Sequence, residues 1–175
     1  QNYHKLDGII NMGFTYNPSA ITSIRTEPLM SEDLYLVGSM GNVDPGSTVS
    51  FVSVCQRSLI LPSRGFGLRD WVEDTALKKN QTIDVVFEID SVATIRDLVE
   101  GGLGWTILPF AAVQQAVQSK RLLASQIISP RVPRTLHLAH ASSHVDNNAA
   151  RAVRGIIDRV IAGSIRASQG RLSAP

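Results

Sequence analysis

Residues 82–109 read TIDVVFEIDSVATIRDLVEGGLGWTILP, and the spacing of their apolar residues changes twice along the stretch. Over residues 82–89 apolar and polar residues alternate, which predicts a β-strand with one buried face. Over residues 92–99 the apolar residues recur every three or four positions, which predicts an α-helix. Residues 105–108 form a second predicted strand. The strand residues expected on one face are Ile83, Val85, Phe87 and Ile89, and the helix residues expected to point inward are Val92, Ile95, Leu98 and Val99.

Residues that commonly cap helices stand at both ends of the predicted helix. Asp90 and Ser91 precede it, and both residue types accept hydrogen bonds from the free amides of a helix start. Gly101 and Gly102 follow it, and glycine adopts the left-handed conformation that ends many helices. One capping residue is enough, so we expect either Asp90 or Ser91 to be free to face a cleft. The stretch is therefore predicted to be a strand–helix–strand unit of an α/β fold.

The alternation of strands and helices continues on both sides of this unit. Because the connections are short, we predict an α/β fold class with a largely parallel sheet covered by helices. Residues 164–175 have little to bury and are expected to be frayed. The further strands predicted are residues 6–12, 34–38, 58–61, 122–123 and 135–141, and the further helices are residues 67–79, a helix opened by Pro109, and residues 146–162.

The composition is typical of a soluble globular protein. Of the 175 residues 43% are hydrophobic, and 17 Lys and Arg stand against 15 Asp and Glu. A net charge of +2 does not by itself indicate nucleic-acid binding. The single cysteine, Cys55, lies in the apolar run 51–55, so it is expected to be buried and no internal disulfide can form. No apolar run approaches the ~20 residues that cross a bilayer and no export signal is visible, so we predict a cytoplasmic protein.

Three segments are predicted to lie beyond the carboxyl ends of strands, where open α/β sheets bind ligands. They are Met12-Gly13, residues 62–67 and Asp90-Ser91. In the second segment, glycines let a ligand approach the backbone, and the helix start that follows favours an anion. Arg64 is suited to a two-pronged contact with a carboxylate, and Phe66 adds an apolar wall. The candidate ligand-binding residues are Met12, Gly13, Ser63, Arg64, Phe66, Gly67, Asp90 and Ser91.

An ordinary turn with a solvated arginine, together with simple helix capping, would explain the same residues, and that interpretation stays open.

Other kinds of site are not predicted. Residues 102–107 run from a helix into a strand, the reverse of a dinucleotide-binding loop. His137, His140 and His144 lack further ligands at suitable spacing, so neither a metal nor a cofactor is predicted. Ser63 has no elbow motif and no histidine in a comparable loop, which argues against nucleophilic catalysis.

Charged residues on two predicted helices are interpreted as solvated faces. On the helix 67–79, whose Trp71 and Leu77 are expected to face inward, the acids Asp70, Glu73 and Asp74 form such a face. On the last helix the basic residues are Arg151, Arg154, Arg159 and Arg166, with Asp158 among them.

The stretch from residue 6 to residue 141 resembles the regulatory domain of LysR-type transcription regulators. The most specific part is Glu88-Ile89-Asp90-Ser91, followed by Leu98-Val99 and then residues 102–109. Residues 32–38 lean towards the nitrogen-assimilation-control branch of the family. The other segments that carry the resemblance are Leu6-Asp7-Gly8-Ile9-Ile10, Pro28-Leu29 with residues 32–38, and residues 59–69.

The resemblance implies a two-lobed fold like that of the type 2 periplasmic binding proteins, with two crossover strands as a hinge. Residues 1–42 and 119–163 would form the first lobe, residues 43–118 the second, and residues 164–175 a tail. The candidate residues would then lie in the cleft where the family binds small effectors, here expected to be an anionic metabolite. The resemblance also implies a receptor without catalysis or membrane contact, which forms dimers that pair into tetramers. The helix 67–79, with Trp71 and Leu77, would lie at the dimer interface.

The resemblance further implies parts that do not precede Gln1 in this sequence. These are two strand–helix units of the first lobe, a linker helix and the winged helix-turn-helix through which the family contacts DNA. We therefore expect a piece of a longer protein with an incomplete first lobe, in which the strand 6–12 exposes an apolar edge that another chain covers. Three alternatives stay open: an extracytoplasmic solute-binding protein of a transporter, an α/β enzyme, and a regulator whose cleft is filled by Phe66 and Trp105.

Overall fold

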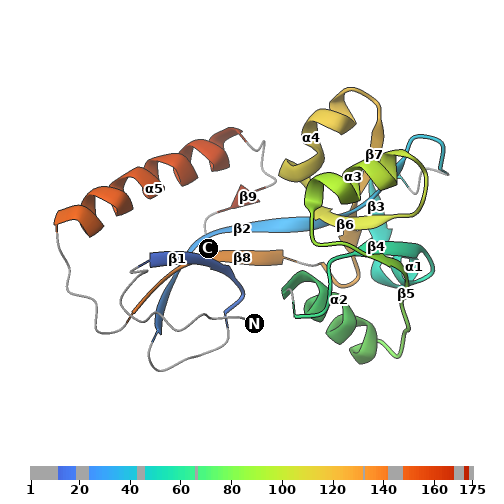
Figure 1. The fold of residues 1–175 in the computed structure, drawn as a ribbon, viewed down its shortest axis with the longest axis horizontal. Coiled ribbons are helices and arrows are strands. Elements are labelled where there is room, and N and C mark those ends of the chain that lie inside the picture. Colours follow the sequence, from blue (N-terminus) through green and yellow to red (C-terminus); the bar gives the residue numbers. More distant parts are fainter. Residues whose placement is uncertain are drawn as a thin grey trace. The chain divides into compact units, whose positions relative to one another are not determined.

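The computed structural model describes residues 12–18, 24–42, 46–65, 67–131, 133–141, 148–167 and 172–173. Contacts divide the chain into two compact units (Figure 1). Unit 1 holds residues 33–132, and unit 2 holds residues 2–32 and 133–175. Strand β2 (Ile24–Ser39) contributes to both, because the chain passes along it from unit 2 into unit 1.

Strands and helices alternate along unit 1, which confirms the predicted α/β class. Its elements after β2 are β3 (Thr48–Ser50), α1 (Phe51–Cys55), β4 (Ser58–Leu61), α2 (Gly67–Lys78), β5 (Asp84–Glu88), α3 (Val92–Glu100), β6 (Thr106–Pro109), α4 (Phe110–Gln118) and β7 (Leu122–Ile128). Unit 2 adds β1 (Met12–Tyr16), β8 (Pro133–Ala141), α5 (Asn148–Ala167) and β9 (Leu172–Ser173). Among the residues described, no helix is long and apolar enough to cross a membrane.

The sheets of unit 1 are mixed, so the prediction of a largely parallel sheet is wrong. Strand β2 pairs antiparallel with both β6 and β7, whereas β3 pairs parallel with β7, and β4 parallel with β5. The antiparallel pairing of β2 with β7 has a simple cause. Strand β2 brings the chain into unit 1 and β7 takes it out, so two neighbouring strands at this end of the unit run in opposite directions.

Strand β4 divides the core of unit 1 into two apolar clusters. Leu59 and Leu61 face residues of α1 and α2, and Ile60 faces residues of α3 and α4. The predicted single face of β5 is wrong, because Ile83 and Val85 pack on the first cluster and Ile89 on the second. The cause is a shift in the pairing register of β4 with β5: Leu59 pairs with Val85, but the next residue, Ile60, pairs with Phe87. The shift depends on how two separate segments of the chain pair, so the spacing of residues within β5 does not predict it.

Most of the predicted helices and caps are confirmed. Helix α2 buries Val72 and Ala76, and α3 buries Ile95 and Val99. The C-cap of α3 is Gly101, and α4 starts after Pro109. Three details differ from the predictions. Leu77 does not face inward, since it is 76% exposed; Val92 is also exposed; and the unpredicted helix α1 carries the buried Cys55, with Ser50 as its N-cap.

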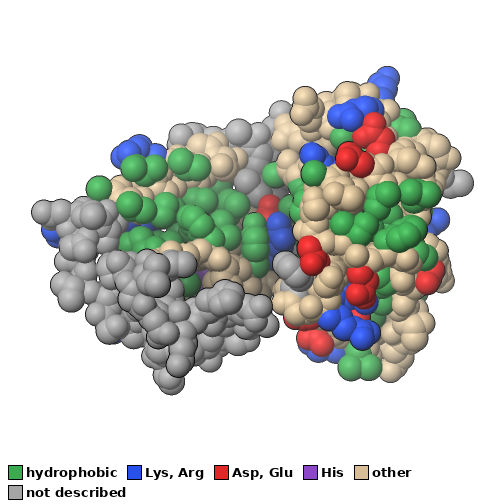
Figure 2. All heavy atoms as spheres, in the orientation of Figure 1, with side chains coloured by type: hydrophobic (Ala, Val, Ile, Leu, Met, Phe, Trp, Pro, Cys, Tyr) green, Lys and Arg blue, Asp and Glu red, His purple; other side chains and the backbone are tan. Residues whose placement is uncertain are grey.

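Unit 2 corrects two predictions about the ends of the chain. Met12 and Gly13 do not form a loop beyond a strand, because they begin β1, which pairs antiparallel with β8 from Met12↔His140 to Tyr16↔Leu136. Helix α5 continues to Ala167, so residues 164–167 are not frayed. Apolar side chains gather along α5 in Figure 2, and the large ones that are exposed include Val153, Ile156 and Val160. Residues 6–11 of the predicted first strand, and hence its expected open edge, lie outside the described residues.

The two compact units are a different division of the chain from the predicted lobes, which stay a prediction. The predicted second lobe is residues 43–118, whereas unit 1 spans residues 33–132. The difference arises because β2 and β7 pair with each other over 35–39 and 122–126, so both strands are held in unit 1.

Candidate functional site

The two predicted strand-end loops lie next to each other at one edge of unit 1. Strands β4 and β5 are parallel, with Leu61 paired to Glu88, so both end at this edge. The Ile89 amide donates to the Leu61 carbonyl over 3.0 Å. One step further, the Ser63 amide donates to Asp90 Oδ1 over 2.9 Å. The starts of α2 and α3 are therefore brought together, as the argument from strand polarity requires.

Asp90 and Ser91 divide two tasks between them. The Ser91 hydroxyl accepts a hydrogen bond from the Thr94 amide over 3.3 Å and is the N-cap of α3. The Asp90 carboxylate receives the Ser63 amide instead and so fastens one loop to the other. The expectation that one of the two side chains is free is wrong, because the second capping residue has found a partner in the neighbouring loop.

Acidic side chains also fix the loop between β4 and α2. The Gly65 amide donates to Asp70 Oδ1 over 3.1 Å, and Gly65 has a φ of +89°, a conformation that favours glycine. Arg64 is 75% exposed and its Nε lies 3.2 Å from Glu73 Oε1. Phe66, also predicted for this site, lies outside the described residues. Asp70 and Glu73 therefore hold the loop in place, through the Gly65 amide and the Arg64 side chain. This corrects their interpretation as a purely solvated face.

Arg69 is the residue of this edge that the sequence analysis missed. Its side chain is only 4% exposed, with Nε 2.8 Å from Glu73 Oε1 and NH2 3.4 Å from Glu88 Oε1. Its NH1 is buried without a hydrogen-bond partner among the described residues. The hydrogen bond from Arg69, followed by that from Arg64, lowers the pKa of the Glu73 carboxyl. The signal was available, since Arg69 and Glu73 are four residues apart on one helix.

The charges of this edge are mixed. Figure 2 shows acidic and basic side chains side by side over α2. The arginines Arg64 and Arg69 are each bound to a carboxylate. Helix starts carry amides without an intrahelical partner, so among the described residues the first turns of α2 and α3, apart from the Thr94 amide bound by Ser91, and the exposed Arg64 are the groups suited to an anion. Over the part of the chain that the structure describes, no three His, Cys, Asp or Glu side chains are grouped to hold a metal ion.

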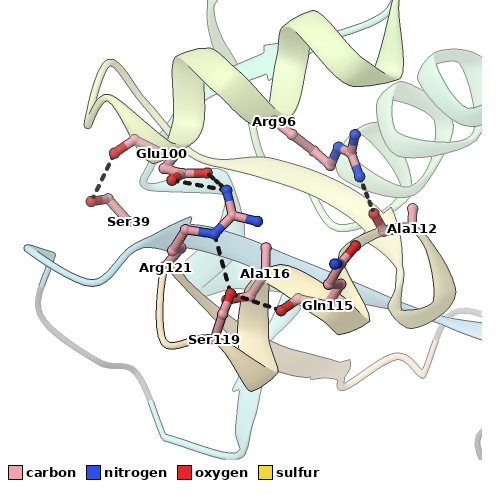
Figure 3. Close-up of polar contacts among 8 residues, drawn as sticks. All are labelled: Ser39, Arg96, Glu100, Ala112, Gln115, Ala116, Ser119 and Arg121. Atoms are coloured by element: carbon pink, nitrogen blue, oxygen red, sulfur yellow. Dashed lines mark hydrogen bonds and ion pairs between the residues drawn. The ribbon is translucent and has the colours of Figure 1, made fainter.

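The opposite end of α3 is fastened by a polar cluster (Figure 3). Arg121 NH1 lies 3.1 and 2.9 Å from the two carboxylate oxygens of Glu100, and its Nε donates to Ser119 Oγ over 3.1 Å. The Ser39 hydroxyl donates to the Glu100 carbonyl over 3.3 Å. Partway along the helix, Arg96 NH1 donates to the Ala112 carbonyl over 3.1 Å. Helix α3 is thus tied to α4 partway along its length and to β2 at its C-terminal end.

The remaining candidate residues, Met12 and Gly13, lie in unit 2 on β1. Trp105 is 7% exposed and belongs to the core of unit 1, packed with Leu59 and Ile107. It does not stand at the edge formed by Ser63 and Asp90, so the alternative in which Trp105 fills a ligand site finds no support in unit 1.

Known proteins resemble this chain over most of its length. A family model described as the LysR substrate binding domain matches residues 5–162. The nitrogen assimilation regulatory protein nac of Escherichia coli (strain K12) is 28% identical over 162 residues, which cover 93% of this chain and 51% of that protein. The chain spans about half the length of the curated relatives it matches, 49% and 51% for the two nac proteins.

Solved structures agree with the predicted fold. The regulatory domain of CcmR from Synechocystis PCC6803, in complex with 2-PG, has a TM-score of 0.77 at 15% identity and matches over 88% of this chain and 74% of that one. The effector binding domain of QuiR, in complex with shikimate, has a TM-score of 0.73 at 17% identity, with 87% and 72% covered. The type 2 periplasmic-binding-protein-like fold is thereby confirmed. The chain belongs to the LysR substrate-binding domain family.

Proposed function

We propose that this chain is the part of a LysR-type transcription regulator that senses a small-molecule effector. The observation that carries the proposal is the 2.9 Å hydrogen bond from the Ser63 amide to Asp90, which joins the starts of α2 and α3 at one edge. Helix starts carry free amides and the positive end of the helix dipole. The effector complexes of CcmR and QuiR support this function over that of a transporter's solute-binding protein.

The effector is proposed to be small and anionic. The amides of Ser63 and Gly65 already donate to carboxylate oxygens, those of Asp90 and Asp70. An effector carboxylate offers the same kind of oxygen to these amides or to the first turns of α2 and α3. Arg64 can exchange Glu73 for the effector at little cost, because exposed ion pairs contribute about 1 kcal/mol or less. Phe66, Gly67, Ser91, and Met12 and Gly13 of unit 2 complete the proposed set of contacts.

In the longer protein, effector binding is proposed to act on DNA through a winged helix-turn-helix. An effector shifts a conformational equilibrium only as far as it prefers one state, so it must favour one arrangement of lobes or subunits. Helix α2 is proposed to lie between subunits of a dimer, and dimers to pair into tetramers. The exposure of the apolar Leu77 supports that position. We also propose that the receptor is cytoplasmic and has no catalytic activity. This proposal agrees with the names of its relatives, which are regulatory proteins.

The experiment is a thermal unfolding assay of the full-length protein with small carboxylic acids, each paired with its neutral ester. Shikimate and its methyl ester are one such pair. At least one acid is expected to raise the melting temperature while its ester does not. Arg64→Ala is expected to abolish this shift, and Arg121→Ala, which removes an exposed arginine at the far end of α3, to preserve it. Equal shifts in the two variants contradict the site, and equal shifts from acid and ester contradict the anionic effector.

A further inference from the structure

One carboxylate oxygen at the edge where β4 and β5 end is shared by two arginines. Glu73 Oε1 accepts from Arg69 Nε over 2.8 Å and from Arg64 Nε over 3.2 Å. The side chain of Arg69 is only 4% exposed, whereas that of Arg64 is 75% exposed. A hydrogen bond away from water is electrostatically stronger than one in contact with it. The contact with Arg64 is therefore the one that a ligand can replace.

The buried Arg69 has donors to spare. A guanidinium carries five N–H donors. The NH2 of Arg69 lies 3.4 Å from Glu88 Oε1, beyond the distance of about 3.2 Å at which N–H···O bonds are good, and its NH1 is buried without a hydrogen-bond partner among the described residues. An unsatisfied buried donor costs free energy, so Arg69 gains from a closer contact with a carboxylate. Glu73 is within reach, because it stands one turn further along α2.

We infer that Glu73 is a built-in competitor of the effector for Arg64, and that Arg69 is its alternative partner. In the free site Glu73 holds Arg64. When an anion takes Arg64, Glu73 turns fully to Arg69, so the carboxylate is paired in both states. The competition with an effector rests on the proposed function, whereas the sharing of Glu73 between two arginines does not.

The competition makes Glu73 a residue that determines specificity. Because Glu73 is fixed on α2 beside Arg64, it competes at a high effective concentration. An anion that contacts Arg64 alone exchanges one exposed ion pair for another and gains almost nothing. An effector that also reaches the first turn of α2 or α3 gains further hydrogen bonds. Glu73 therefore makes the site reject simple anions in favour of larger effectors.

Double-mutant cycles of urea unfolding test the sharing without any ligand. Arg64→Met alone is expected to change the equilibrium constant for unfolding by less than about twofold, because Arg69 retains Glu73. In an Arg69→Met background Arg64 is the arginine left to Glu73, and its loss is expected to cost about fivefold. Arg121→Met removes an exposed arginine paired with Glu100 and should act equally in both backgrounds. Equal effects of Arg64→Met in the two backgrounds overturn the sharing.

A second measurement serves if Arg69→Met fails to fold. The carboxyl of Glu73 is titrated by NMR in the parent and in Arg64→Met. The hydrogen bond from Arg69 is the largest cause of the lowered pKa of Glu73, so this pKa is expected to stay below its ordinary value in Arg64→Met. A return of the pKa to the ordinary value overturns the sharing.

The competition is tested by calorimetric titration of the full-length protein with the acids of the thermal unfolding assay, shikimate among them. Glu73→Gln removes the competing charge and is expected to bind an acid about fivefold more tightly than the parent does. Asp74→Asn removes the same charge from an exposed position of α2, and the affinity is expected to change by less than about twofold, because salt screens charges that are not in contact.

Two outcomes overturn the competition and leave the proposed site in place. One is equal affinity of the parent and Glu73→Gln, and the other is an equal gain in Glu73→Gln and Asp74→Asn. If no acid binds to the parent or to Glu73→Gln, the proposed function and the competition fail together, and the unfolding cycles still decide whether Arg64 and Arg69 share Glu73.

Discussion

The middle of unit 1 and its strand-end edge are held together by different forces. In the middle, Trp105 is packed among buried apolar residues, and its backbone bridges to Leu59 of β4. At the edge, the loops after β4 and β5 are fixed by the carboxylates of Asp90 and Asp70, which accept backbone amides in exposed hydrogen bonds. Close packing tolerates little change of shape, whereas exposed hydrogen bonds exchange with water or a ligand at small net cost. The packed middle therefore sets the geometry of the edge, and the proposed effector would act on contacts that are exchanged at small cost.

The largest expected effect is on the middle, from Gly38→Ala. A Cβ at Gly38 would lie 2.3 Å from the Trp105 ring, far inside van der Waals contact, so either the ring or β2 must move. Overpacking of this kind is expected to lower the free energy of unfolding by about 3 kcal/mol. Denaturation by urea, followed by tryptophan fluorescence, measures it. Gly67→Ala is the control, because a Cβ there meets nothing within 4 Å; a loss as large as that of Gly38→Ala would contradict the account.

Much of this comparison was accessible from the sequence, since local patterns determine helices and caps. Residues 90–102 contain an N-capping residue, a stripe of apolar residues and a glycine that ends the helix, and α3 forms as predicted. Parallel strands end at the same edge, so the nearness of Ser63 to Asp90 could be inferred without coordinates. The register shift opposite β5 and the antiparallel course of β2 against β7 depend on partners distant in sequence, which local spacing does not encode.

The candidate site was less predictable than the fold. The sequence indicates Arg64 because it stands in a glycine-containing loop, whereas Arg69 stands inside a helix, where nothing local distinguishes a buried arginine from a solvated one. Asp90 was expected to cap a helix, and its partner in the other loop became visible only when the strands were placed side by side. Side-chain partners across two loops depend on tertiary structure, and the sequence alone does not fix them.

Arg69→Met is the second-largest expected change and compares two arginines of the edge. Arg69 is buried and joins α2 to the end of β5, so its loss leaves Glu73 and Glu88 without their shared partner. We expect the free energy of unfolding to fall by about 2 kcal/mol, less than when one partner of a fully buried pair is removed, because both carboxylates are partly exposed. Arg64→Met is the matched control and should change it by less than about 0.5 kcal/mol. Equal losses from the two variants would show that burial of Arg69 is unimportant.

Thr106→Val tests the middle in the opposite direction. Thr106 is fully buried on β6, and its hydroxyl has no hydrogen-bond partner among the residues described. Valine has nearly the same shape without the polar group, so we expect unfolding to cost about 1 kcal/mol more than in the parent. Thr106→Ser keeps the hydroxyl and removes the methyl group, and it is expected to destabilise by a similar amount. A higher melting temperature for Thr106→Ser than for Thr106→Val would mean that the hydroxyl has a hydrogen-bond partner in the folded protein.

The smallest expected effect is the pH dependence contributed by Glu73 at the edge. Its carboxyl has a pKa below the ordinary value of 4.5, first because of the hydrogen bond from Arg69 and then that from Arg64. Because the pKa of this carboxyl is lower in the folded than in the unfolded state, the ionised carboxylate stabilises the fold at pH values above the ordinary pKa. This stability is lost as the pH falls through the folded-state pKa. Between about pH 6 and about pH 3 the parent is expected to lose more stability than Glu73→Gln, by less than about 1 kcal/mol because the carboxylate is partly exposed. Urea denaturation of the parent and of Glu73→Gln at several pH values measures the difference. If Glu73→Gln and the parent fall in parallel, the ion pairs of this edge contribute no measurable stability, and the edge is held by its backbone hydrogen bonds alone.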